Sequence, residues 1–195
     1  MYKKMAEING LDMQTGVGQA LFDNVDNPTK RYFLEKRWDK GNKILGAIMM
    51  NPSKAGNVES DKTVNRLIDY AKGKGYSAIY VINVSPHIES ASSKLNKVNG
   101  ENYDKDIQTK CFKFVVEKST SIYLGWGSKG HPFFKRLVKN NGIIKNLFSK
   151  HLNKFEGVIN SNKKYPTHPS PRNADGLNEQ TNLNKISSDV KEWLK

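Results

Sequence analysis

Four short polar segments, each at or after the end of an apolar or strand-like run, hold the residues best suited to chemistry in this 195-residue chain. They are Asn51-Pro52-Ser53, Asn83-Val84-Ser85-Pro86, Gly125-Trp126-Gly127-Ser128 and His168-Pro169-Ser170-Pro171. Proline stiffens such loops, whereas serine and glycine let a phosphate or another backbone approach closely. Amide, imidazole and hydroxyl groups supply hydrogen-bond donors and acceptors, so we expect these segments to form a functional site.

Strand-length runs precede the four segments. We predict buried strands at residues 44–50, 78–84, 121–126 and 155–159. Residues 31–38 alternate apolar and charged side chains, which predicts a half-exposed strand that Gly41-Asn42 joins to the next strand as a hairpin. Residues 1–28 are polar and glycine-rich without a sustained period, so we expect an irregular N-terminal arm followed by a domain over residues 29–195.

Helical spacing of apolar residues fills the stretches between the strands. Asp61 is a plausible N-cap for a helix that ends at Gly73, and further helices are predicted at 104–117, 133–140, 143–151 and 177–194. This alternation predicts a single α/β domain with three α/β/α layers and a mostly parallel central sheet. Because ligands bind outside the carboxyl ends of parallel strands, the four polar segments should meet at that edge.

Composition restricts the classes of function. The chain has 32 Lys and Arg against 19 Asp and Glu, a net charge of +13 that favours a nucleic-acid partner, although a merely solubilising surface would look similar. Cys111 is the sole cysteine, so one chain can form neither an internal disulfide nor an iron–sulfur cluster. No leader-like or membrane-length apolar run is visible. We expect a cytoplasmic monomer without metal or cofactor.

The polar segments resemble motifs of the uracil-DNA glycosylase superfamily. His168-Pro169-Ser170-Pro171 is identical to the second catalytic motif of the uracil-specific branch, and Trp126-Gly127-Ser128 resembles its glycine–serine loop. Asn83 stands where the superfamily keeps the asparagine that reads the base. Met50-Asn51-Pro52 resembles the first catalytic motif in the Asn-Pro form of mismatch-specific and single-strand-selective relatives.

The complete order of motifs is still more similar to an uncharacterised bacterial and phage domain family. The family pattern is RYxLxRxWD, NPS, DxT, GY, WG and a C-terminal HP, and the resemblance covers roughly residues 31–175. The chain matches it except at Lys36, which stands where the pattern has its second arginine. Asp61 reads here as a helix cap, and Arg31, Arg37 and Trp38 as packing residues. His87, His131 and His151 read as surface or structural residues.

The superfamily resemblance implies a monofunctional DNA glycosylase that hydrolyses the N-glycosidic bond of a flipped pyrimidine and leaves an abasic site. Asn51 would orient the water, and His168 would donate a hydrogen bond to the departing base. Asn83 would bind the Watson–Crick edge of that base. An asparagine cannot take a proton at neutral pH, so we expect slower turnover than with an aspartate at position 51.

Ser53 bears on the substrate, because the uracil-specific branch has a bulkier tyrosine after its Asp-Pro. A pocket open at that position would accept a 5-modified pyrimidine, such as the modified cytosine of phage DNA, in an antiviral role. Residues expected to contact DNA are Lys54, Ser85, Ser128, Lys129, Ser170 and Arg172. Arg172 departs from the pattern, because the superfamily often has a leucine wedge there.

Two other functions fit the same residues. One is a catalytically inactive nucleic-acid-binding module of the same fold, and the other is a hydrolase of free nucleotides or nucleosides. A binding module would tolerate loss of Asn51. A free nucleotide does not require a broad basic surface, so the net charge disfavours the second alternative.

Overall fold

The computed structural model describes residues 12–15, 18–53, 61–88, 102–159, 164–169, 177–178 and 180–195. Within these residues, the strands are β1 (Asp12–Thr15), β2 (Gly18–Phe22), β3 (Arg31–Arg37), β4 (Ile44–Met49), β5 (Ala78–Asn83), β6 (Ser121–Gly125), β7 (Phe155–Gly157) and β8 (Asn184–Lys185). The helices are α2 (Lys62–Gly73), α3 (Lys105–Lys118), α4 (Gly127–Asn140), α5 (Gly142–Lys150) and α6 (Ser187–Trp193). A 3-10 turn, Leu152–Lys154, leads into β7.

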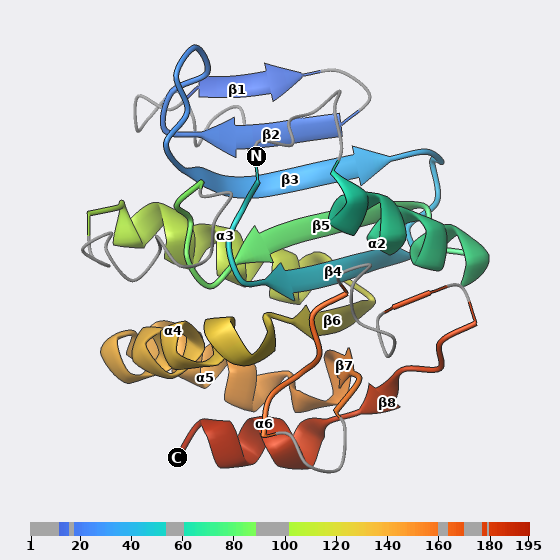
Figure 1. Ribbon diagram of the computed structural model, residues 1–195, viewed down its shortest axis with the longest axis vertical. Coiled ribbons are helices and arrows are strands. Elements are labelled where there is room, and N and C mark those ends of the chain that lie inside the picture. Colours follow the sequence, from blue (N-terminus) through green and yellow to red (C-terminus); the bar gives the residue numbers. More distant parts are fainter. Residues whose placement is uncertain are drawn as a thin grey trace.

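The strands form one sheet in the order β1-β2-β3-β5-β4-β6-β7-β8 (Figure 1). The four central strands, β5, β4, β6 and β7, are parallel to one another. Antiparallel strands flank them, with β3, β2 and β1 on one side and β8 on the other. The α/β prediction is therefore confirmed, and the sheet is mixed, with its parallel strands in the core.

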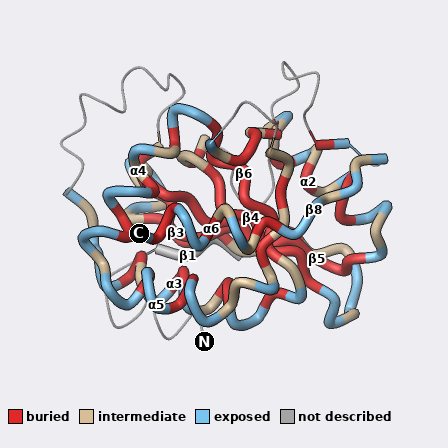
Figure 2. Tube along the Cα trace, turned by 90° about the horizontal axis from the view of Figure 1, so that it is seen from below, coloured by how far each residue is buried: buried red, intermediate tan, exposed pale blue. Residues whose placement is uncertain are grey.

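Two apolar layers cover the sheet, one on each face, as the alternation of side chains along a strand requires. Leu45, Ala47 and Met49 of β4 pack with α2 on one face. Ile44 and Ile48 of the same strand belong to the opposite layer, which α3, α4, α5 and α6 complete. Figure 2 shows the buried strands between α2 on one side and α3 and α5 on the other. Among the described residues, no helix is both long and apolar enough to span a membrane.

The predicted hairpin between β3 and β4 is wrong. β3 pairs antiparallel with β5, with Leu34 opposite Val81, whereas β4 lies on the far side of β5 and pairs with both β5 and β6. β4 is buried along its whole length, and a strand of this kind needs a hydrogen-bonding neighbour on each side. A local turn signal cannot reveal that a later strand separates the two.

β3 is also more buried than its alternating pattern predicted, since only Arg37 is not fully buried. Its pairing with β2 shifts at one point: Leu21 is opposite Phe33, but Phe22 is opposite Arg31. The extra residue, Tyr32, is a β-bulge and joins Phe33 in the layer of α3. The bulge thereby turns Arg31 towards the face that carries Leu34 and α2.

Three further boundaries differ from the prediction. The expected irregular arm contains β1 and β2, which add an antiparallel pair to the edge of the sheet. α4 begins at Gly127 although it contains Pro132, so the glycine and proline residues that predicted a loop here are incorporated into the first turns. The last helix is limited to Ser187–Trp193, because residues 184–185 pair with β7 as a strand.

Candidate functional site

The carboxyl ends of the central strands bring the four polar segments to one edge of the sheet. Met49 at the end of β4 is in register with Asn83 on one side and with Gly125 on the other. Beyond the strand ends, the Val84 amide donates to the Met49 carbonyl at 2.9 Å, and the Ser85 amide donates to the Met50 carbonyl at 3.0 Å. Backbone hydrogen bonds thus hold the segment after β4 against the segment after β5.

The Asn51-Pro52-Ser53 segment crosses from β4 towards α2. Asn51 is half-buried, and its Nδ2 group donates to the Pro52 carbonyl at 3.1 Å. The Ser53 hydroxyl donates to the Oδ2 atom of Asp61. Ser53 is therefore held in place by the residue that begins α2.

Asp61 does more than cap a helix. Its Oδ1 atom accepts the backbone amides of Thr63 at 2.8 Å and Val64 at 2.7 Å, as an N-cap does, which leaves Oδ2 for Ser53. Arg31 is 2% exposed, and burial lowers its guanidinium pKa to about 10 while the charge of Asp61 opposes that shift. A buried cation and this carboxylate therefore adjoin the segment that contains Asn51.

Sequence reasoning missed this pairing and assigned Arg31 to packing alone. The signal was present, because Arg31 and Asp61 both belong to the shared motif pattern. Their proximity depends on the bulge in β3, which no sequence period discloses.

Asn83 is buried at the end of β5, with 4% of its surface exposed. Alternation along the strand places its side chain on the α2 face, with Ile79 and Val81. Its backbone carbonyl accepts a hydrogen bond from Gln108 Nε2 at 3.4 Å. Its side-chain Nδ2 has no hydrogen-bond partner among the described residues, which is costly for a buried donor and typical of a group that binds a ligand.

His168 is held against the segment that joins β6 to α4. The Gly127 amide donates to the Pro166 carbonyl at 3.1 Å, and the Tyr123 hydroxyl donates to the Thr167 carbonyl at 2.7 Å. A Cβ atom added to Gly127 would lie 3.1 Å from the Cβ of His168, and Gly127 has a φ of +67°. Both the contact and the left-handed backbone require glycine here.

Burial lowers the pKa of His168, and the negative charge of Asp61 opposes that shift. The imidazole is therefore neutral at pH 7. A neutral imidazole offers one N–H donor and one acceptor without placing a full positive charge in the site. Asp61, which accepts the Ser53 hydroxyl, is thus close enough for its charge to act on His168.

The expected DNA-binding residues are distributed unevenly. Ser128 and Lys129 are exposed in the first turn of α4, whose N-cap, Trp126, provides no side-chain cap. Ser85 is 5% exposed and its Oγ atom lies 3.3 Å from Nδ1 of His87, so it faces the interior rather than the surface. Lys54, Ser170 and Arg172 lie outside the described residues.

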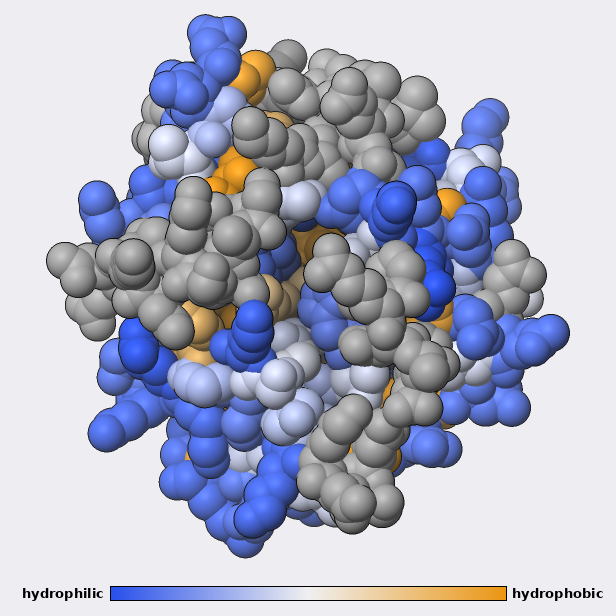
Figure 3. Space-filling view, viewed as in Figure 1, coloured by the Kyte–Doolittle hydropathy of each residue, from blue (hydrophilic) through white to orange (hydrophobic). Residues whose placement is uncertain are grey.

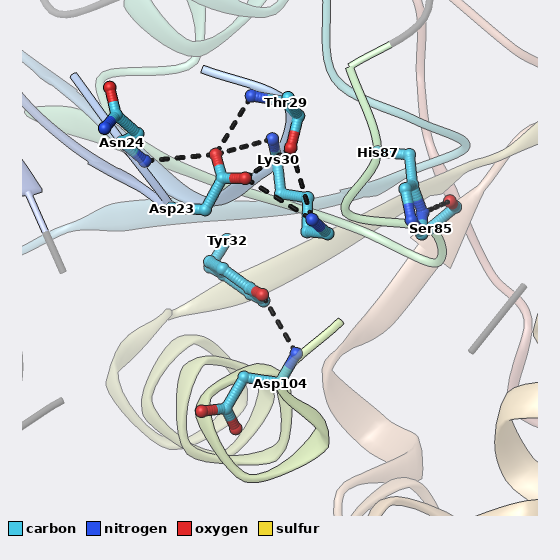
Figure 4. A network of polar contacts seen from close by, with 8 residues as sticks. All are labelled: Asp23, Asn24, Thr29, Lys30, Tyr32, Ser85, His87 and Asp104. Carbon is cyan, nitrogen blue, oxygen red and sulfur yellow. Dashed lines mark hydrogen bonds and ion pairs between the residues drawn. The ribbon is translucent and has the colours of Figure 1, made fainter. Parts of the chain in front are cut away.

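Near Ser85, Figure 4 shows a network of polar contacts in separate groups, one around Asp23 in the β2–β3 turn and one between Ser85 and His87 after β5. Asp23 accepts hydrogen bonds from the backbone amides of Thr29 and Lys30, and Lys30 forms a β-bridge with His87. The His87 ring packs edge-on against Tyr103 with centroids 5.9 Å apart. His87 is accordingly structural, and the network supports the site without belonging to it.

Figure 3 shows that the side of the molecule seen in Figure 1 is predominantly hydrophilic, with a recess near its centre where less polar side chains are visible. A separate cavity of about 450 Å³ is lined by Arg66, Asp69, Leu177, Asn178 and Gln180. That cavity does not include Asn51, Asn83 or His168. Within the described part of the chain, no three His, Cys, Asp or Glu side chains converge as metal ligands would.

The family model described as "Protein of unknown function (DUF1643)" matches residues 31–170, and the chain belongs to this family. The matched region includes Asn51, Asn83 and His168. No curated protein and no solved structure matches the chain.

Proposed function

We propose that the protein is a monofunctional DNA glycosylase that removes a flipped, 5-modified pyrimidine from DNA and leaves an abasic site. The observation that carries this proposal is the convergence of Asn51, Asn83 and His168 at one edge of the sheet, where the buried amide nitrogen of Asn83 has no partner among the described residues. The likeness of the surrounding motifs to the uracil-DNA glycosylase superfamily supports the same chemistry.

In the proposed reaction, water attacks C1′ of the deoxyribose as the bond from C1′ to the base nitrogen breaks. The electron pair of that bond passes to the base, which leaves as an anion, and the sugar resembles an oxocarbenium ion in the transition state. The proton that the attacking water loses passes to the solvent, and the solvent protonates the departed base. The Asn51 side-chain oxygen orients the water but takes no proton. The neutral His168 imidazole donates a hydrogen bond to the base oxygen on which negative charge develops, a contribution of about 3–4 kcal/mol when such a donor is fixed in advance.

Two residues select the base. The Asn83 amide presents a planar donor and acceptor to the edge of a pyrimidine, and its burial excludes water as a competing partner. Ser53 is small and is held by Asp61, so it leaves room beside carbon 5 of the ring. This room suits modified cytosines of phage DNA, and we propose an antiviral role for the activity in the cytoplasm.

The test is incubation of the protein with DNA duplexes and single strands that carry uracil, mismatched thymine, 5-hydroxymethylcytosine or glucosylated 5-hydroxymethylcytosine. Mass spectrometry should detect a released 5-modified base. Asn51→Ala and His168→Ala should each lower the rate of release about 10²–10³-fold while DNA affinity is retained.

Other outcomes would redirect the proposal. Activity confined to uracil would reject the open pocket at Ser53. DNA binding without release of any base would favour an inactive binding module, in which Asn51→Ala changes nothing. Cleavage of free nucleosides or nucleotides in preference to DNA would favour a hydrolase of these small molecules.

A further inference from the structure

α4 and α5 form the most one-sidedly charged part of the chain. Between Glu117 and Glu156 there is no acidic residue, whereas this stretch contains eight Lys and Arg residues, more than half of the net charge of +13. The two helices account for most of these cations. The charge of the protein is therefore concentrated rather than spread evenly.

Packing turns these cations outward on a shared surface. The rings of Phe134 in α4 and Phe148 in α5 lie 5.3 Å apart, so the helices pack together through their apolar sides. The exposed cations opposite those sides, here called the α4–α5 basic surface, are Lys129, Arg136, Lys139, Lys145 and Lys150. Within the described part of the chain, the last four of these make no ion pair.

Two other cations of the stretch have internal tasks. Lys154 Nζ donates to the carbonyls of Val116, Glu117 and Ser119 at 2.9, 3.0 and 2.9 Å, and so closes the end of α3. Lys135 Nζ donates to the Trp193 carbonyl at 3.1 Å. Such bonds give these two lysines a role in folding, whereas within the described part of the chain the side chains of Arg136, Lys139, Lys145 and Lys150 make no comparable hydrogen bond.

The basic surface adjoins the candidate site. α4 begins at Gly127, the residue packed against His168, and extends from the carboxyl edge of the sheet (Figure 1). Lys129 lies in its first turn. A polyanion bound along α4 would therefore reach His168, at the edge of the sheet where Asn51 and Asn83 also lie.

We propose that the α4–α5 basic surface binds the phosphate backbone of duplex DNA and holds the strand whose base enters the site. The choice of DNA as the polyanion rests on the proposed function. Phosphate contacts by Lys and Arg position a protein on DNA without reading its sequence, which suits a surface outside the base pocket. An anionic membrane is the weaker alternative, because Ile143 is the one large hydrophobic side chain exposed among the described residues, at 65%.

The test measures the binding of a fluorescein-labelled, unmodified 20-bp duplex by anisotropy between 50 and 300 mM KCl. The variant is the triple substitution Arg136→Gln, Lys139→Gln and Lys145→Gln. The matched control is Lys105→Gln, Lys110→Gln and Lys113→Gln on α3, which removes the same charge from a helix that also carries Asp106 and Glu117. Thermal unfolding verifies that both variants are folded.

The α4–α5 variant should raise Kd at least tenfold at 100 mM KCl and lower the slope of log Kd against log salt by about 2–3, since each lost phosphate contact removes about 0.9. The α3 control should change Kd less than threefold. Equal effects of the two variants would overturn the proposal, because net charge alone would then explain binding. Tighter binding of the protein to phosphatidylserine vesicles than to the duplex would also overturn the proposal.

The unmodified duplex contains no base to excise, so this result is independent of catalysis. If base release is found but the two triple variants bind alike, the glycosylase proposal stands and the α4–α5 basic surface does not. If the α4–α5 variant weakens DNA binding but no base is released, the α4–α5 basic surface stands and the glycosylase proposal does not.

Discussion

The two edges of the central sheet differ in the kinds of polar group that lie there. The segment Arg31–Asp39 reaches both edges, since β3 runs from Arg31 at the carboxyl edge of the parallel strands to Arg37 at their amino edge. At the amino edge, Trp38 Nε1 donates to the Tyr76 carbonyl at 2.8 Å, and Arg37 Nε donates to Glu35 at 2.8 Å. The Ser77 carbonyl accepts the amides of Trp38 and Asp39, both at 3.2 Å.

The carboxyl edge has a different character. Here a buried amide nitrogen, Asn83 Nδ2, lacks a partner within the described residues, and a neutral histidine lies near the Arg31 and Asp61 charges. Unsatisfied buried groups cost stability, and such a cost persists where a ligand repays it. Under the proposed function, the carboxyl edge binds the substrate, in accordance with the position of ligands in other α/β sheets.

Asn83→Leu should separate stability from function most strongly. Replacing an unpartnered buried amide by an apolar side chain of similar size should leave the free energy of unfolding unchanged or raise it. Base release should fall about 100-fold because the base loses its recognition partner. Urea denaturation and release kinetics on the same preparation test both expectations. A clear loss of stability would show that Asn83 is a structural residue.

Gly127→Ala and Gly75→Ala form a matched pair across the two edges. Both glycines have positive φ angles, +67° and +71°, so each alanine should cost about 1–2 kcal/mol of stability. A Cβ at Gly127 would press on His168, whereas at Gly75 nothing lies within 4 Å. Only Gly127→Ala should therefore also slow base release, by roughly tenfold. Equal activity of the two variants would mean that the position of His168 is unimportant.

Trp38→Phe probes the amino edge. Loss of the hydrogen bond from Nε1 to the Tyr76 carbonyl should lower the free energy of unfolding by about 1 kcal/mol, measured by urea denaturation. Base release per folded molecule should not change. If Trp38→Phe slowed base release by more than the loss of folded protein explains, the amino edge would contribute to the activity as well as to folding.

The smallest expected effect is a dependence of stability on pH. Burial lowers the pKa values of His87, His131 and His168 in the folded protein below the value of about 6.5 for an unperturbed histidine. Below pH 6.5 the unfolded chain therefore takes up protons first, and the free energy of unfolding falls as the pH decreases towards the folded pKa values. Above pH 7.5 all three are neutral in both states and contribute no slope.

Urea denaturation between pH 5.5 and 7.5 measures this slope. Replacing His131, a histidine outside the site, by glutamine should make the slope shallower. A slope unchanged by His131→Gln would assign the acid sensitivity to other groups.

Sequence patterns predicted the bounds of those buried strands that form the centre of the sheet. β4, β5 and β6 are apolar runs ended by polar segments, and the structure places them within a residue or two of the prediction. The partners of β3 could not be predicted, because its pairing with β5 joins residues more than 40 positions apart, whereas turn residues report only local geometry.

In the candidate site, too, local sequence predicted some features and not those that depend on contacts between side chains. Asn83, His168 and the Asn51 segment were predictable because strand ends mark the edge at which they meet. The role of Asp61 was not, since a helix cap and a second contact to Ser53 use different oxygens of one carboxylate. The interior position of Ser85 was equally hidden, because it depends on His87 two residues later.

The central claim is that Asn51 acts on the water that replaces the base. Its most direct test is the mass of both products when a duplex with one 5-modified cytosine is incubated with the protein or with Asn51→Ala at equal bound fraction. The account predicts a free modified base and an uncut strand with one abasic site for the unaltered protein, and almost none of either for Asn51→Ala. Equal release by both proteins, or a bound duplex that keeps every base, would contradict it.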